Sequence, residues 1–139
     1  MSATKNANRQ CVEVATCEFT YDQLTDATYE PMIDLPLGAI VVGGFLAITT
    51  LFNSATTDVF SIGDKRGHAA ANNTRYAATT ADVTATGPAA EITPTGEEMT
   101  EASTVGIVWD GTGTAPSAGA GILVVEYIIA DRAESTFEA

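Results

Sequence analysis

Histidine, the side chain that most often moves protons in catalysis, occurs once in this chain, as His68. It lies in the polar stretch 65–80, and no serine nucleophile motif is near it in the sequence. A catalytic triad or a histidine-based metal site needs further partners arranged around such a residue. The sequence therefore places His68 in a surface loop, outside any catalytic or metal site.

Carboxylates are the second set of candidates, because a pair of them can hydrolyse a glycosidic bond. Glu97, Glu98 and Glu101 follow a Pro-Thr-Gly sequence at residues 94–96. No apolar stretch surrounds them that could raise the pKa of one carboxyl group for proton donation. We interpret this segment as a solvated acidic loop.

Bound calcium is an alternative use of the acidic residues, since hard cations bind carboxylate and carbonyl oxygens. However, Asp58, Asp64 and Asp110 do not have the spacing of an EF-hand loop. Zinc is not indicated either, because the chain has no Cys-x-x-Cys pair and no metal-binding Cys/His spacing. The sequence predicts no metal site, with calcium as the alternative.

Glycine-rich and aromatic residues complete the candidates. The stretches 111–113 and 119–121 are rich in glycine, but neither is followed by the Lys-Ser or Lys-Thr of a phosphate-binding loop. Trp109 and Tyr127 could stack on sugar rings, yet both lie in apolar runs, which favours a place in the core. Because no complete set of catalytic groups is present, we predict that the chain is not an enzyme and uses no cofactor.

The two cysteines, Cys11 and Cys17, lie in one segment with strand character. On an extended strand their Cα atoms are about 20 Å apart, from six steps of ~3.3 Å. A disulfide needs Cα atoms within about 7 Å, and no Gly or Pro marks a turn between the two residues. We predict two half-buried free thiols, as expected for a protein made in a reducing compartment.

The whole chain has 139 residues, 45% of them hydrophobic, which fits one globular domain. It has 18 acidic and 6 basic residues, and a formal net charge of −12. The phosphate backbone of a nucleic acid or an anionic membrane repels such a surface. The composition therefore argues against nucleic acid and membrane as main partners.

Charge also divides the chain into segments. Residues 1–10 carry Lys5 and Arg9 and no acidic residue, which suggests an extended arm that docks on an acidic neighbouring subunit. The alternative is a frayed terminus. Residues 11–130 are expected to form a single domain, followed by a mostly acidic tail at 131–139. The start has no apolar stretch typical of a signal peptide, so we expect a soluble protein made in the cytoplasm.

Short apolar runs between Gly and Pro turns, without a convincing amphipathic helix, indicate an all-β protein. The expected strands are residues 11–19, 39–42, 45–51, 58–62, 81–86, 89–95, 104–110 and 121–130. The last of these is apolar on both faces and is therefore expected to be a central strand. Some seven or eight short strands favour a jelly roll, a β-sandwich or a barrel.

Several irregular features are also expected between and within these strands. The alternation of apolar residues in 11–19 changes phase, which predicts a bulge near Ala15 and Thr16. Gly43 and Gly44 predict a bend, a bulge or a tight backbone crossing between two strand pieces. The polar stretch 65–80 is expected to be a long surface loop, with a short helix near 74–78 as an option, and 22–30 a loop or a single helical turn.

The order of several short motifs resembles a known family. They are LPLGAIVVGG at residues 35–44, TTLFNS at 49–54, DVFSIGD at 58–64, RYAA at 75–78, and AG at 118–119 ahead of VVEY at 124–127. This ordered set, which covers roughly residues 11 to 130, is similar to the head decoration, or cement, proteins of tailed bacteriophages. The set is more specific for a virion protein than for the head as opposed to the tail.

The resemblance implies a jelly-roll or β-sandwich body, often assembled as a homotrimer. It also implies a position on the outside of the capsid, where the protein clamps neighbouring major capsid subunits, and it brings no catalytic residues. Within this interpretation the candidate partner-binding residues are Lys5, Arg9, Phe45, Leu51 and Phe52, with the apolar residues around 45–52 as candidates for contact between copies.

Two other functions remain as alternatives. One is a tail or fibre module that binds host glycan or another tail protein, which needs exposed aromatic residues beside polar groups, and the aromatic content is only 7%. The other is a small hydrolase of cupin-like shape. Cupin metal sites use several histidines, and this chain has one.

Overall fold

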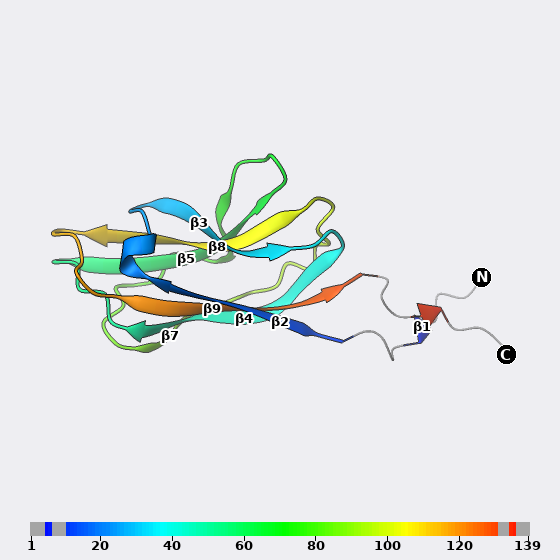
Figure 1. Ribbon diagram of the computed structural model, residues 1–139, viewed down its shortest axis with the longest axis horizontal. Coiled ribbons are helices and arrows are strands. Elements are labelled where there is room, and N and C mark those ends of the chain that lie inside the picture. The colour runs from blue at the N-terminus through cyan, green and yellow to red at the C-terminus, as the bar shows by residue number, and fades with distance from the viewer. Residues whose placement is uncertain (1–4, 7–10, 131–133, 136–139) are drawn as a thin grey trace.

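Two four-stranded antiparallel sheets packed face to face make up the body of the protein (Figure 1). The structure is a computed structural model and describes residues 5–6, 11–130 and 134–135. The first sheet has the order β2-β9-β4-β7, from β2 (Glu13–Thr20), β9 (Ala120–Ile129), β4 (Ala39–Thr50) and β7 (Gly87–Glu91). The second has the order β3-β8-β5-β6, from β3 (Thr28–Leu35), β8 (Ser103–Thr112), β5 (Thr57–Arg66) and β6 (Asn72–Ala77).

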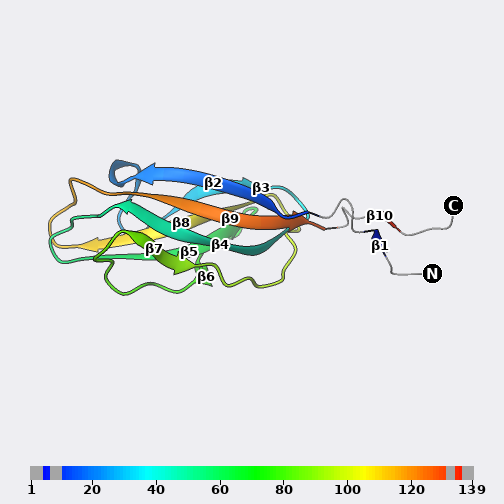
Figure 2. The ribbon, with the colours of Figure 1, turned by 90° about the horizontal axis from the view of Figure 1, so that it is seen from below.

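The connections between these eight strands follow the jelly-roll pattern. Only β5 and β6 are consecutive neighbours within one sheet, and every other connection among the eight crosses between the sheets. As a result β2 pairs with β9 and β3 with β8, so the first strands lie beside the last. Figure 2 looks onto the outer face of the β2-β9-β4-β7 sheet. The expected all-β jelly roll is confirmed.

The described parts of the two chain ends also meet. Residues of β1 (Lys5–Asn6) pair antiparallel with those of β10 (Glu134–Ser135), beyond one end of the sandwich (Figure 1). The rest of the expected arm and tail, including Arg9, lies outside the described residues. The arm and the tail thus share a described contact that the sequence did not indicate.

The core lies between the sheets, where alternate residues of each strand point inward. Phe60, Ile62, Leu46, Ile107 and Leu123 are fully buried there. Strand β9 is a central strand, as predicted, because it is hydrogen-bonded to β2 on one side and to β4 on the other.

Aromatic rings gather at one place in this core, around Phe52. Its ring centroid lies 5.2 Å from that of Phe60, 5.9 Å from that of Trp109 and 6.5 Å from that of Phe19. The first pair meets edge to face, a favoured geometry for aromatic rings. Only 4% of the surface of Phe52 is exposed, because its ring packs inside the body. Phe52 is therefore not available to a partner in this structure.

The Gly43-Gly44 pair lies at a bulge of β4, as the sequence predicts. The register between β4 and β9 shifts between Val41 and Gly43, and Gly44 has a φ of +136°. A Cβ on Gly44 would lie 2.1 Å from the backbone oxygen of Val124 on β9. Glycine is required here because β4 passes too close to β9 for any side chain.

In the first half of the chain one predicted feature is wrong and one strand was not predicted. The pairing of β2 with β9 runs from Glu13 to Thr20 without a shift, so no bulge lies at Ala15 and Thr16. The alternation changes phase in the sequence only because Val12 and Val14 are apolar but exposed, whereas Phe19 is buried in the core. Strand β3 was missed, since its sequence contains Pro31 and acidic residues. It is an edge strand, which tolerates proline.

The second half of the chain holds the other corrections. β5 does not end at Gly63 but continues to Arg66, and Asn72–Ala77 form the edge strand β6 instead of a loop or helix. A Cβ on Gly63 would lie 2.0 Å from the backbone oxygen of Asn72, so this glycine permits β6 to pass close to β5. Residues 81–86 form no strand. The apolar pattern missed β6 because an edge strand pairs on one side only and can carry polar residues, and it ended β5 too early because Gly63 and Asp64 are typical turn residues.

Candidate functional site

The candidate catalytic side chains are not gathered in one place. His68 is exposed in the turn between β5 and β6, and Glu97, Glu98 and Glu101 are exposed in the segment before β8. Trp109 is buried in the core, where its Nε1 donates a hydrogen bond to Asp58 Oδ1 at 2.9 Å. Among the described residues, no three His, Cys, Asp or Glu side chains are grouped so that they could hold a metal ion.

The buried carboxylate Asp64 organises the main charge cluster. Its side chain is 1% exposed and accepts hydrogen bonds from Arg66 Nε at 2.9 Å and from Arg75 Nε at 2.6 Å. The hydroxyl of Tyr76 donates a third bond at 3.3 Å. Arg66 Nη1 also bonds Glu97 Oε2 at 3.0 Å. The cluster therefore links β5, β6 and the segment after β7.

Electrostatics within this cluster favour the charged form of Arg66 and the neutral form of Tyr76. Burial works against the charge of Arg66, but hydrogen bonds to Asp64 and Glu97 outweigh it and raise the pKa of the guanidinium. The hydrogen bond from Arg66 lowers the pKa of Glu97. Burial, followed by the nearby charge of Asp64, raises the pKa of Tyr76 to about 12. These groups hold fixed protonation states near neutral pH, which suits a structural role.

A second buried carboxylate, Asp58, fixes the connection between β4 and β5. Its oxygens accept hydrogen bonds from the Ser54 hydroxyl at 2.6 Å and the Ser54 backbone N–H at 3.1 Å, in addition to the bond from Trp109. The backbone N–H of Asp58 in turn donates to Asp82 Oδ1 at 2.8 Å. Both buried aspartates thus serve the fold, and neither opens onto a cavity as a reactive group.

The outer face of the β2-β9-β4-β7 sheet carries several partly exposed apolar side chains. Cross-strand pairing sets side chains there in rows: Thr16 beside Val124 and Phe45, and Glu18 beside Ile122 and Ala47. Val14 and the pair Ile40–Ile128 continue the surface toward the other end. We call this set the apolar face, defined by Val14, Ile40, Phe45, Ile122, Val124 and Ile128.

Exposure confirms that this face is accessible to a partner. Val14 is 60% exposed and Phe45 38% exposed, and the other four side chains of the set are partly exposed. Isolated apolar residues at a surface need no explanation, but a contiguous set marks an interaction site. The face is therefore the candidate functional site of this protein.

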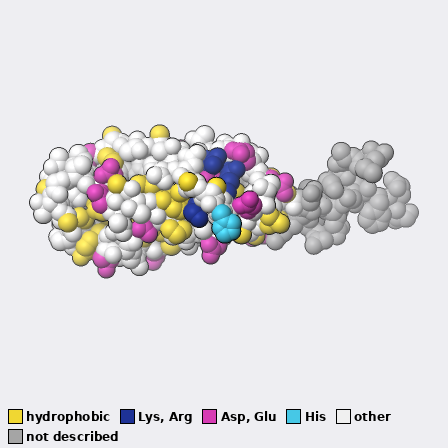
Figure 3. Space-filling model, turned by 90° about the horizontal axis from the view of Figure 1, so that it is seen from above, with side chains coloured by type: hydrophobic (Ala, Val, Ile, Leu, Met, Phe, Trp, Pro, Cys, Tyr) yellow, Lys and Arg dark blue, Asp and Glu magenta, His cyan; other side chains and the backbone are white. Residues whose placement is uncertain are grey.

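The outer face of the β3-β8-β5-β6 sheet differs in character. One of its rows pairs Asp34 with Thr104 and Lys65. In another, the small residues Gly106 and Gly63 lie side by side, and the Tyr29 hydroxyl reaches Thr104. Figure 3 looks onto this side and shows Lys and Arg side chains gathered among carboxylates over one part of it. Tyr29 and Val108 are partly exposed on this side, and Figure 3 shows hydrophobic side chains here too, so the two outer faces differ chiefly in charge: Lys65 lies on this one, whereas the four strands of the other contain no Lys or Arg.

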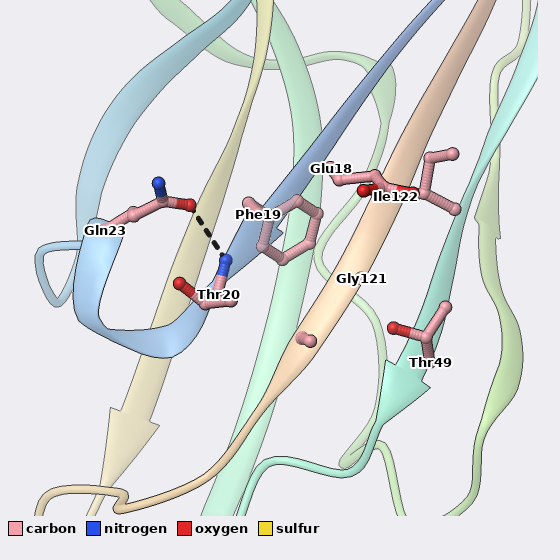
Figure 4. Close-up of a pocket in the computed structure, with 8 residues that line it drawn as sticks. Glu18, Phe19, Thr20, Gln23, Thr49, Gly121 and Ile122 are labelled. Carbon is pink, nitrogen blue, oxygen red and sulfur yellow. Dashed lines mark hydrogen bonds between the residues drawn. The ribbon is translucent and has the colours of Figure 1, made fainter.

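A hollow of about 530 Å³ lies at one end of the apolar face (Figure 4). The small residues Ala120 and Gly121 of β9 line it, with Thr20 on one side, Thr49 on the other, and Glu18 and Ile122 at its edge. The Oε1 of Gln23 accepts a bond from the backbone N–H of Thr20 at 2.9 Å, which closes the turn beside it. The hollow is open and lacks a cluster of reactive groups.

Part of this face was predicted from the sequence. Phe45 belongs to it, and Leu51 is 37% exposed just after β4, so both remain available to a partner, whereas Phe52 is in the core. Lys5 lies in β1 opposite Ser135, and Arg9 lies outside the described residues. The contributions of β2 and β9 were missed, although the exposed Val14 and the doubly apolar β9 were visible as patterns.

Both cysteines are free, as predicted, but only the thiol of Cys17 is half-buried; Cys11 is exposed, because it lies just before the start of β2, so the predicted burial is wrong for Cys11. Burial, and then the charge of Glu18, raises the pKa of the Cys17 thiol. A raised thiol pKa leaves less reactive thiolate at a given pH. Iodoacetamide at pH 8 is therefore expected to modify the exposed Cys11 first and Cys17 more slowly, as measured by intact mass over time.

A Cys11→Ser variant isolates the slow reaction of Cys17 and serves as the control. In denaturant without reductant, the wild-type protein should gain two adducts per chain. Finding none there would mean that the cysteines are joined, and equal rates in the folded protein would contradict the burial of Cys17.

Known proteins share this fold. A chain of the capsid asymmetric unit of cyanophage Pam1 superposes with a TM-score of 0.66 and 20% identity, over 93% of this chain and 92% of that chain. A chain of the acidic stable capsid structure of Helicobacter pylori bacteriophage KHP30 gives a TM-score of 0.63 and 16% identity, over 85% and 87% of the two chains. At these identities the likeness is one of fold. No protein-family model and no curated protein matches the chain. No helix in the described part of the chain is long and apolar enough to span a membrane.

Proposed function

We propose that this chain is a virion structural protein that binds the outside of a phage capsid and stabilises it by bridging major capsid subunits. The observation that carries the proposal is the jelly roll itself, shared over most of the chain with chains from two phage capsid structures. The ordered motifs of the sequence support the same role independently. The protein acts through surface contact and not as an enzyme.

The apolar face supports this proposal, because a protein that works by contact needs a surface to offer. The two buried aspartates of the body, Asp58 and Asp64, do not suggest catalysis, because their carboxyl groups are hydrogen-bonded to side chains that hold the fold. Bridging several subunits at once adds weak contacts through effective concentration. A shell held in this way resists expansion, because several contacts must break together.

The homotrimer and the arm belong to the same proposal. A trimer offers three copies of each contact to neighbouring capsid subunits, which raises the avidity of attachment. Lys5 and Arg9 provide positive charge that suits carboxylates on a neighbouring subunit, and such exposed pairs weaken as salt rises. Lys5 and Asn6 of the proposed arm pair with Ser135 and Glu134 in the acidic tail.

Purified protein is expected to bind capsids of its source phage that lack this chain, and to raise the temperature at which those capsids release DNA. Co-sedimentation measures the binding, and a dye-release melt measures the stabilisation. Cryo-electron microscopy of the particle then distinguishes the head surface from the tail. Density for this chain on the tail alone, or no co-sedimentation at any salt concentration, would overturn the proposal.

A further inference from the structure

The charge on the apolar face is of one sign. Glu18 lies on β2, Glu126 on β9 and Glu91 on β7, and cross-strand pairing places them beside Ile122, Val14 and Phe45. A Cβ on Gly43 would lie 3.2 Å from Glu126 Oε1, so this carboxylate lies over β4 on the outer side. None of the four strands of this sheet contains Lys or Arg.

This pattern describes the surface that would fit. Interfaces have an apolar centre with a polar rim, and charges across them are complementary. We propose that the apolar face binds a second protein whose own contact surface has apolar side chains at its centre and Lys or Arg at its edge. Under the proposed function, on which the identity of this partner rests, that protein is the major capsid protein.

A second copy of this chain does not fit the apolar face. Two such faces packed together place Glu18, Glu91 and Glu126 of both copies in one interface without a Lys or Arg on these strands to pair with them, and like charges at an interface cost several kcal/mol. The other sides of the body of a second copy, residues 11–130, offer little positive charge. The only Lys and Arg in residues 11–130 are Lys65, Arg66 and Arg75, and both arginines bind Asp64 and Glu97. We therefore assign Phe45 to contact with the capsid, and contact between copies to another surface.

The hollow gives this partner a place to anchor. A Lys or Arg side chain entering it can lay its apolar stem along Ile122 and bring its charge to Glu18, with the hydroxyls of Thr20 and Thr49 nearby (Figure 4). The small residues Ala120 and Gly121 leave the room that such a side chain needs. An anionic side chain is disfavoured at the same place by the carboxylate.

The size of the face limits how tightly one copy can bind. Four strands ~4.8 Å apart and about eight residues of ~3.3 Å give a surface of roughly 500 Å². A stable interface of standard size buries about 800 Å² on each partner. One face alone is thus expected to bind weakly and to depend on several copies acting together.

The test uses the full chain and capsids of the source phage that lack it. Phe45→Asp and the charge reversal Glu126→Lys are expected to lower the apparent affinity at least tenfold in co-sedimentation. Their controls are Leu37→Asp, an exposed apolar residue in the β3–β4 turn, and Asp34→Lys on the other sheet, both expected to bind within about twofold of wild type. Circular dichroism melts confirm that each variant is folded.

The outcomes separate this inference from the proposed function. If wild type binds and the two face variants bind as well as their controls, the face assignment is wrong while the capsid function stands. If wild type itself does not bind, the function fails. Sedimentation velocity supplies the last distinction: Phe45→Asp is expected to keep the oligomeric state of wild type, and its conversion to monomers would assign the face to contact between copies.

Discussion

Replacing Gly44 by alanine is expected to destabilise the protein by about 4 kcal/mol, from overpacking of ~1–3 kcal/mol and backbone strain of ~1–3 kcal/mol. The new Cβ would lie 2.1 Å from the Val124 backbone oxygen and 2.9 Å from Ile92 Cδ1, and φ is +136°. Relief requires β4 to move from β9, and these strands are the centre of the first sheet. Thermal and urea unfolding, followed by circular dichroism, measure the loss.

Gly87→Ala is the matched control, because Gly87 has a φ of +114° but no atom within 4 Å of its Cβ position. It reports backbone strain without the collision. If the two variants lose the same stability, close packing of β4 on β9 is not the reason for glycine at position 44. Because β4 and β9 carry much of the apolar face, a folded Gly44→Ala protein should also bind capsids less well.

Asp64→Asn is the second substitution with a large expected effect, a loss of about 3–5 kcal/mol. The amide keeps the shape of the carboxylate but has one acceptor oxygen, so it cannot serve Arg66 and Arg75 together. Two guanidinium groups then lose their buried counter-charge. Urea denaturation measures the change, and hydrogen exchange is expected to show the loss first in β6, which only β5 holds in the sheet.

Glu97→Gln provides the contrast, since Glu97 is an exposed partner of the same arginines. Its unfolding midpoint should stay close to that of wild type, because exposed ion pairs contribute little. Equal losses for the two variants would mean that the cluster works as a surface network, and no loss for Asp64→Asn would show that the buried charge is dispensable.

Much of the fold could be predicted from the sequence, because the central strands carry the strongest patterns. β8 and β9 were located closely, and the bulge of β4 was predicted from its two glycines. The edge strands β3 and β6 were not, since each needs to satisfy only one neighbour and can contain proline, asparagine and charge. The end of β5 was also predicted too early. Gly63 and Asp64 form a Gly-Asp pair, which is typical of turns, yet the strand continues through them to Arg66.

The candidate site was harder to predict than the fold. Phe45 was found because it is apolar in a strong strand, but the same criterion selected Phe52, which is in the core. Which side of a strand faces outward depends on its register with neighbours, and that is a long-range property. The apolar face joins residues from β2, β4 and β9, and only the completed sheet brings them together.

The pairing of the first strand of the body with its last has a mechanical consequence. Glu13 at the start of β2 is paired with Tyr127 near the end of β9, so both ends of the body leave from the same corner. A force that pulls these ends apart acts on one hydrogen-bonded pair at a time and peels β2 from β9 as a zipper opens. A load spread over the broad side of a sheet instead meets all strands together. This body is therefore suited to carry a load that is spread over the broad side of a sheet. It is poorly suited to act as a tether that is pulled by its two chain ends.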